Sequence, residues 1–192
     1  MTAVDDQGEP AKPRVRRIKT MEITPLGHDE FGFTARLIDE SFGGAYGDDN
    51  ASSVVIHDFG LEGALMGSTL EVVRLQAHAV THPYDSCPFV LDVAQELVGT
   101  RLGSGWRKRV LAFAGGVRGC THVNTLVLGL SEVQPLIFFL KMNESVPFTA
   151  QNRADGSWLG AGLKFAPQLA DACFSLRKGG PVLGRLSPEA SD

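Results

Sequence analysis

Cysteine is scarce in this chain of 192 residues: there are only three, an odd number, and no C-x-x-C pair occurs. A small disulfide scaffold depends on a dense and even set of cysteines, so this class is excluded. We therefore expect reduced thiols, and with them a cytoplasmic location. The sequence also lacks a G-x-S-x-G elbow, which excludes a serine hydrolase of the α/β type.

An excess of positive charge is absent too. Lys and Arg total 18 against 22 Asp and Glu, which gives a formal net charge of −4, so we expect no nucleic-acid partner. A long apolar run is also missing, because Glu132 and Pro135 interrupt the longest apolar stretch, residues 123–140. No export signal is visible near the N-terminus. The expectation is a soluble protein with no membrane partner.

Apolar and polar residues alternate through much of the first half of the chain, a period typical of β-strands. The alternation is clearest over residues 31–37. It predicts two antiparallel strands joined by a turn at residues 25–28. Two further strands are expected around residues 54–56 and 70–79.

Helical periodicity follows in the second half. Apolar residues recur at helical spacing over 90–98, with Pro88 in the first turn, and again over 106–113 and 123–130. A last helix is expected over 165–176, with Cys173 in the core. Strands followed by helices predict an α+β fold, an antiparallel sheet with helices packed on one face. We expect one domain over residues 14–182, flanked by disordered tails at 1–13 and 183–192.

Two cysteines precede predicted helices. Cys87 lies just before Pro88, and Cys120 precedes an apolar helical pattern with His122 two residues later. The backbone amides and the positive dipole of a helix start favour a thiolate, so both are candidates for chemistry. The alternative is that each is a small buried apolar residue.

Other polar residues are weaker candidates. His57 and Asp58 end an apolar strand, where neighbouring side chains point to opposite faces, so both could ligate one ion only if the strand ends or bulges there. Arg118 belongs to a basic stretch over residues 101–118 that could hold an anionic ligand, or could be a solvated helix face.

Several of these segments together resemble a bacterial domain family of unknown function. Its most specific signature is the G-C-T-H segment at residues 119–122, and the resemblance spans residues 16–182. The other matching segments are IHD at 56–58, YDSCP at 84–88, GW at 105–106 and DAC at 171–173. The resemblance supplies no settled activity, but it favours Cys87, Cys120, His122, His57 and Asp58 as one set.

The chain is more distantly similar to NifU-type and SufU-type iron–sulfur scaffold proteins. In those proteins antiparallel strands precede two cysteines at helix starts, positions that Cys87 and Cys120 match here. A further cysteine and an aspartate complete the scaffold site, whereas this chain has His57 and Asp58 between its strands. The resemblance implies a scaffold-like fold, and the departure favours a mixed site for zinc or iron.

Three classes of function remain open. In the leading interpretation Cys87 and Cys120 are thiolate ligands of a Zn²⁺ or iron ion, and the other ligands come from His57 or Asp58 and from His122. An open coordination position would then make the protein a metal-dependent catabolic enzyme acting on a small acidic or CoA-linked substrate, with Cys87, Cys120 and His122 as catalytic residues and Arg118 as the cofactor-binding residue. The second class is a metal-free enzyme with a Cys87 nucleophile and a histidine base. The third is an interaction module that binds a protein partner.

Overall fold

The computed structural model describes residues 14–42 and 53–186, together with residues 4 and 8. The chain divides into two compact units, Met1–Ser131 and Glu132–Asp192, whereas the sequence predicted a single domain over 14–182. The predicted tail at 1–13 lies almost wholly outside the described residues. So does most of the tail predicted at 183–192, although Leu183–Arg185 forms a short 3₁₀ turn, η5.

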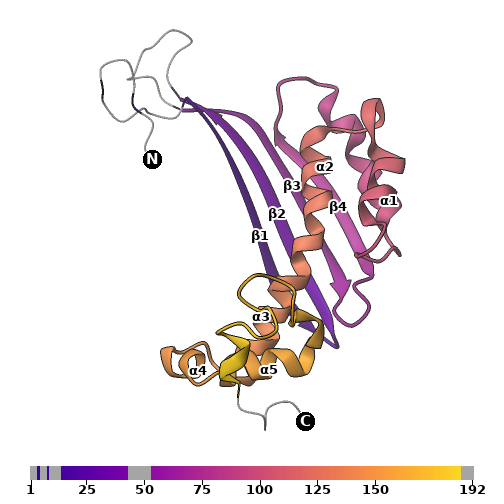
Figure 1. Ribbon diagram of the computed structural model, residues 1–192. Coiled ribbons are helices and arrows are strands. Elements are labelled where there is room, and N and C mark those ends of the chain that lie inside the picture. The colour runs from indigo at the N-terminus through magenta and orange to yellow at the C-terminus, as the bar shows by residue number, and fades with distance from the viewer. Residues whose placement is uncertain (1–3, 5–7, 9–13, 43–52, 187–192) are drawn as a thin grey trace. The chain divides into compact units, whose positions relative to one another are not determined.

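The first unit contains a four-stranded antiparallel sheet in the order β1-β2-β3-β4 (Figure 1). The strands are β1 Val15–Gly27, β2 Glu30–Ser41, β3 Val54–Met66 and β4 Val72–Thr81. His28 and Asp29, with φ of 50° and 64°, form a two-residue turn between β1 and β2, as tight hairpins require. The sheet and its topology confirm the strand part of the predicted α+β fold.

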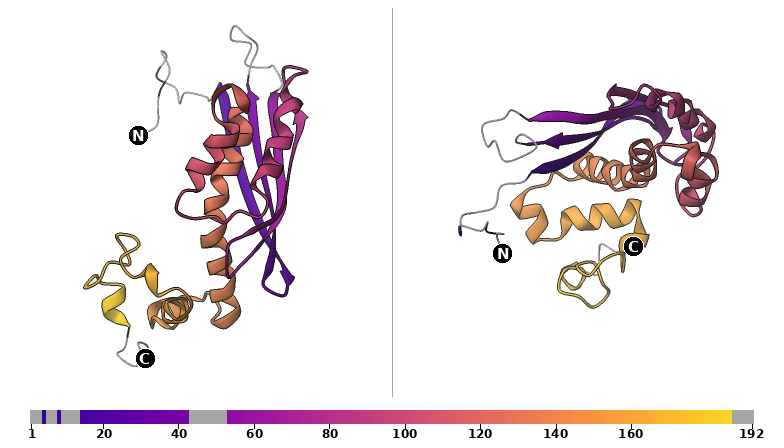
Figure 2. Two further views of the ribbon diagram at one scale, coloured as in Figure 1. Left: turned by 90° about the vertical axis from the view of Figure 1, so that its right-hand side faces the viewer. Right: turned by 90° about the horizontal axis from the view of Figure 1, so that it is seen from above.

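Helices cover one face of this sheet, here called the inner face (Figure 2). The helical segments of the unit are η1 Cys87–Leu97, α1 Trp106–Ala114, η2 Gly116–Arg118, α2 Thr121–Gly129 and η3 Leu130–Glu132. The segment η1 packs against β4, and α2 packs against β2 and β3. The Trp106 indole donates a 3.0 Å hydrogen bond to the Val127 carbonyl and so ties α1 to α2. The strands contribute Leu37, Phe59, Leu61 and Leu75 to the core beneath these helices.

One predicted helix differs in type. Residues 87–97 form 3₁₀ turns instead of the α-helix that the periodicity predicted over 88–98. Ala94 and Leu97 are buried as expected, but Val98 is exposed. Pro88 cannot donate a backbone hydrogen bond, and the short turns at Tyr84 and Ser86 lead directly into tighter i to i+3 geometry.

The second unit is helical, with α3 Val133–Ser145, α4 Ala150–Ala154, α5 Ser157–Phe165 and the 3₁₀ turns η4 Pro167–Leu169 and η5. Pro135 lies in the first turn of α3, where no backbone donor is needed, so helical structure continues through it. The Trp158 indole donates a 2.9 Å hydrogen bond to Asn143 Oδ1. The same ring packs against Phe139 and Phe148 and joins α3 to α5.

The prediction of a helix over residues 165–176 is wrong. The last α-helix, α5, ends at Phe165, and Ala166 takes φ −142°, ψ 72° before Pro167. A residue before proline is disfavoured in the helical region, so the proline fixes this end. Asp171 has a positive φ of 68° in the turns that follow. Cys173 is therefore exposed and does not pack in the core.

Within the part of the chain that the structure describes, one helical segment, Thr121–Ser145, is long and apolar enough to cross a membrane. Core helices of water-soluble proteins can be equally long and apolar. Val123, Leu126, Val127 and Leu130, in the first half of this segment, are buried within the protein.

Gly63 of β3 provides a test of how closely the sheet is packed. A Cβ at this position would lie 2.2 Å from the Arg74 carbonyl oxygen and 2.8 Å from the Phe33 ring. We expect Gly63→Ala to lower the free energy of unfolding in urea by about 1–3 kcal/mol, because neither neighbour can move freely. Gly184→Ala, whose Cβ would meet nothing within 4 Å, is the control. Equal stability of the two variants would contradict this packing.

Candidate functional site

The candidate site begins with a cross-strand pair at one end of the sheet. Asp39 of β2 and His57 of β3 are direct partners in the antiparallel register. Each lies two residues from a core residue of its strand, Leu37 and Phe59, so alternation places both side chains on the inner face. Nδ1 of His57 is 3.1 Å from Oδ2 of Asp39.

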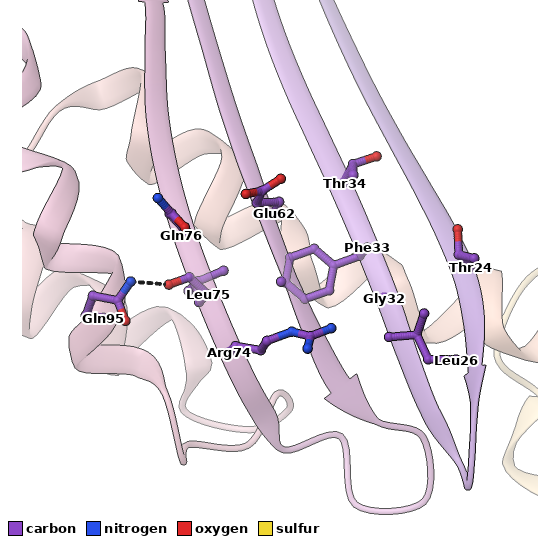
Figure 3. A pocket seen from close by; sticks show the side chains of 11 residues that line it. Thr24, Leu26, Gly32, Phe33, Thr34, Glu62, Arg74, Leu75, Gln76 and Gln95 are labelled. Atoms are coloured by element: carbon purple, nitrogen blue, oxygen red, sulfur yellow. Dashed lines mark hydrogen bonds between the residues drawn. The ribbon is translucent and has the colours of Figure 1, made fainter.

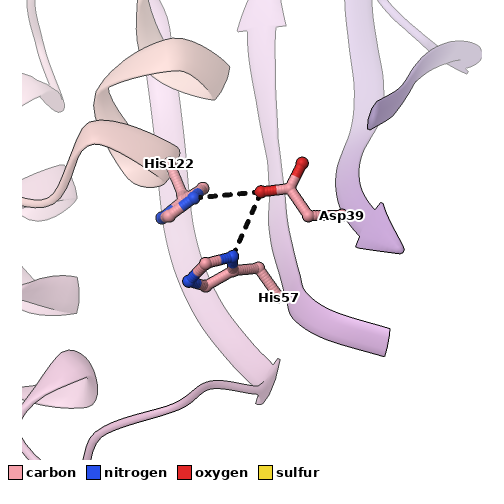
Figure 4. A group of neighbouring side chains, drawn as sticks. All are labelled: Asp39, His57 and His122. Carbon is pink, nitrogen blue, oxygen red and sulfur yellow. Dashed lines mark hydrogen bonds and ion pairs between the residues drawn. The ribbon is translucent and has the colours of Figure 1, made fainter. Parts of the chain in front are cut away.

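The third member of the site comes from α2. His122 lies in the first turn of this helix, and its Nε2 is 3.2 Å from the same oxygen, Oδ2 of Asp39 (Figure 4). Its imidazole lies 3.9 Å from that of His57, centroid to centroid, and stacks on Phe59 at 5.2 Å. Among the residues that the structure describes, Asp39, His57 and His122 form the group of potential ligands whose donor atoms all lie within 4.8 Å of one another. We call them the histidine–aspartate cluster.

Arg17 of β1 fixes the orientation of the Asp39 carboxylate. It forms a bidentate pair, with Nε 2.6 Å from Oδ1 and Nη2 2.8 Å from Oδ2. Two parallel hydrogen bonds from a planar guanidinium set the plane of the carboxylate as well as its position. Oδ2 of Asp39 therefore faces nitrogen atoms from three other side chains.

The electrostatics of the cluster favour an ionised carboxylate and a neutral imidazole. The hydrogen bonds from Arg17 lower the pKa of Asp39 and outweigh its partial burial. Burial lowers the pKa of His122, and the neighbouring His57 adds to this effect. A neutral imidazole beside an anionic carboxylate is the protonation state that metal binding requires.

Cys120 lies beside the cluster, at the N-cap of α2 as predicted. Its Sγ is 3.4 Å from Nδ1 of His122. Sulfur and carboxylate thus approach opposite nitrogens of one imidazole ring. Cys120 is outside the group of mutually close donor atoms.

The other predicted site residues occupy different places. Asp58 is only 4% exposed and points to the outer face of the sheet, where Arg36 forms a bidentate pair with it. The ladder has irregularities beside both Asp39 and Asp58, yet they do not bring Asp58 into the cluster. Of the pair predicted from the strand end, only His57 joins the cluster.

Cys87 and Arg118 are also outside the cluster. Cys87 is the first residue of η1 and is partly buried. It follows β4, whose last residue, Thr81, pairs with Asp58, so η1 starts near the same end of the sheet. The guanidinium of Arg118 is directed back to the Leu111 carbonyl oxygen, 3.4 Å away. The use of Cys87 and Cys120 as ligands of one ion would require them to lie close together, and this stays a prediction.

The sequence interpretation missed Asp39 and Arg17. Asp39 continues the alternation of Phe33, Ala35 and Leu37 and so occupies a core-facing position. A charged residue at such a position was the available signal, because a buried charge needs a partner.

The first unit has several surface hollows. One of about 430 Å³ adjoins the cluster and is lined by Val15, Arg16, Arg17, Asp39, Glu40, Ile56 and His57. Another, of about 360 Å³, lies over the sheet where Gly32 and Gly63 carry no side chain (Figure 3). Its only charged lining residues are Glu62 and Arg74. The first hollow therefore gives access to two of the three candidate ligands, Asp39 and His57.

Comparison with known families gives one match. Residues 15–135 match a family described as "Protein of unknown function (DUF2889)". This confirms the resemblance to a domain family of unknown function over residues 15–135. Its extension to residue 182, the bacterial origin and the likeness to iron–sulfur scaffolds stay predictions. The comparisons with curated proteins and with solved structures give no match.

The lowered pKa of His122 makes stability depend on pH. The folded state binds fewer protons here than the unfolded state, whose histidine has a pKa of 6.5. Stability is therefore full above pH 6.5 and falls as the pH drops from there toward the lowered folded pKa. Urea unfolding of chelator-treated protein should show this slope, and His122→Asn should flatten it.

His82→Asn is the matched control, because His82 bonds to the Tyr84 carbonyl oxygen and lies outside the cluster. An unchanged slope in His122→Asn would show that another group causes the pH dependence.

Proposed function

We propose that this chain, which belongs to the DUF2889 family of proteins of unknown function, binds one divalent transition-metal ion, Zn²⁺ or Fe²⁺, at the histidine–aspartate cluster. One observation carries the proposal: nitrogens of two adjacent imidazoles face the same carboxylate oxygen. Two histidines and one carboxylate are ligands that both metals accept.

The distances within the cluster suit a shared ion. Ligand atoms about 2.0–2.2 Å from a metal are roughly 3.0–3.4 Å from each other in tetrahedral or octahedral geometry. Asp39 Oδ2 is 3.1 Å from His57 Nδ1 and 3.2 Å from His122 Nε2. Arg17 holds the carboxylate by two hydrogen bonds, as outer partners of metal ligands commonly do.

Three protein ligands leave coordination positions open, and this favours an enzyme over a purely structural site. A bound ion there could activate water or polarise a carbonyl group of a substrate. Arg16 and Arg17 line the adjoining hollow together with the apolar side chain of Ile56. Both arginines pair with neighbouring carboxylates but are half exposed, so they could still attract an anionic group. We therefore retain a small acidic or CoA-linked substrate, with Arg17 in place of Arg118 as the cation nearest the proposed metal.

The ligand set favours a single ion over an iron–sulfur cluster. Clusters are held mainly by cysteine thiolates, whereas this cluster contains imidazoles and a carboxylate. A scaffold-like relation to NifU-type and SufU-type proteins would thus concern ancestry and fold, with a different metal function. Cys87, Cys120 and Cys173 are all free thiols, which supports the proposed cytoplasmic location.

Metal analysis tests the proposal directly. The full chain, expressed with zinc and iron supplied and purified without chelator, should carry about one equivalent of one metal. His57→Asn, His122→Asn and Asp39→Asn should each lose most of it. A wild-type content below about 0.1 equivalent, with no uptake on titration with Zn²⁺ or Fe²⁺, would contradict the proposal.

Asp58→Asn is a matched control for Asp39→Asn. Both aspartates form bidentate pairs with an arginine, but Asp58 lies on the outer face and outside the cluster. This variant should keep its metal even if its stability falls. Equal metal loss in both aspartate variants would point to general loss of structure.

A second function is favoured by one contact. Cys120 Sγ, His122 and Asp39 are linked in the order of a nucleophile, its base and the group that orients the base. Without a metal, Cys120 in place of Cys87 would be the nucleophile of a thiol enzyme.

Alkylation separates these two functions. In a metal-free thiol enzyme, Cys120 should react with iodoacetamide faster than Cys87, and His122→Asn should slow it by about 10²–10⁴-fold. Peptide mapping of the modified protein measures both rates. Reaction of Cys120 at the rate of the exposed Cys173 would exclude an activated nucleophile.

A further inference from the structure

The two nitrogens of His122 face different partners. Nε2 faces Asp39 Oδ2 at 3.2 Å, and Nδ1 faces Cys120 Sγ at 3.4 Å. The lone-pair directions of the two nitrogens diverge across the imidazole ring. An ion bound by Nε2 together with Asp39 and His57 therefore lies on the side of the ring away from the sulfur.

We propose that Cys120 is a positioning residue and not a ligand of the metal. Its sulfur accepts a hydrogen bond from Nδ1–H of His122 and so selects the tautomer in which Nε2 is free to bind the ion. This inference rests on the metal function proposed above. It replaces the role as ligand that the sequence indicated for Cys120.

The surroundings of His122 explain why such a contact is needed. The ring packs against two others, that of His57 at 3.9 Å and that of Phe59 at 5.2 Å between centroids, and these contacts restrict its plane. Stacking does not distinguish the two orientations related by a half-turn of the ring. That half-turn would direct ring carbons at both the sulfur and the carboxylate, so polar contacts at both nitrogens select one orientation.

The backbone places the sulfur where this contact requires it. Cys120 is the N-cap of α2, and its carbonyl accepts a 2.9 Å hydrogen bond from the Asn124 amide. Cys120 and His122 thus belong to the same first turn. The cluster then has an outer partner for the carboxylate, Arg17, and one for the α2 histidine, Cys120.

Two substitutions test the role of Cys120. Cys120→Ala removes the acceptor, and its affinity for Zn²⁺ should fall by about 10–100-fold, as for other outer partners of metal-bound histidines. Cys120→Ser keeps a hydrogen-bond acceptor and should bind Zn²⁺ more tightly than Cys120→Ala. Competition titration against a chromophoric chelator measures both, and Cys173→Ala controls for loss of a thiol.

X-ray absorption of the zinc-loaded protein supplies a readout that stability does not affect. We expect nitrogen and oxygen neighbours at about 2.0–2.2 Å and no sulfur at about 2.3 Å. A sulfur neighbour that disappears in Cys120→Ala would make Cys120 a ligand and overturn the inference. Wild-type affinity in Cys120→Ala would overturn it as well. Absence of metal from the wild-type protein itself would overturn the proposed function and this inference together.

Discussion

One oxygen atom, Oδ2 of Asp39, connects the three parts of the site. It receives Arg17 from β1, His57 from β3 and His122 from α2, each within 3.2 Å. The inner face at this end of the sheet is thus closed by polar contacts where the apolar core ends. Because every contact involves the same ionised group, the geometry of the cluster depends on one carboxylate.

The fold was predictable where periodicity and composition agree. Alternation in β2 and the helical spacing in α1 and α2 identified the sheet, its covering helices and Cys120 at a helix start. The prediction of a helix over residues 165–176 failed because of a proline. Pro167 prevents a helix after Phe165 although the apolar spacing continues, and a local backbone restriction there outweighs side-chain pattern.

The site was predictable only in part, because it depends on pairing between distant residues. His57 and His122 were identifiable from their neighbours in sequence. Asp39 was not, since its role follows from the register that pairs it with His57. Asp58 was predicted as a ligand because it is next to His57 in the sequence. The pleat of β3 turns its side chain to the opposite face of the sheet, where Arg36 binds it.

The opposite orientations of His57 and Asp58 also affect the fidelity of folding. A slip of β3 by one residue against β2, in the direction that pairs Asp58 with Asp39, would exchange His57 and Asp58 between the two faces. Asp58 would then stand beside Asp39, carboxylate against carboxylate, while Arg36 would lose its partner. The native register of β2 and β3 is therefore favoured over this slipped register by contacts on both faces of the sheet. A single-residue insertion or deletion in β3 that causes this slip would abolish both the His57–Asp39 pair and the Asp58–Arg36 pair. We therefore expect β3 to tolerate substitutions better than changes in its length.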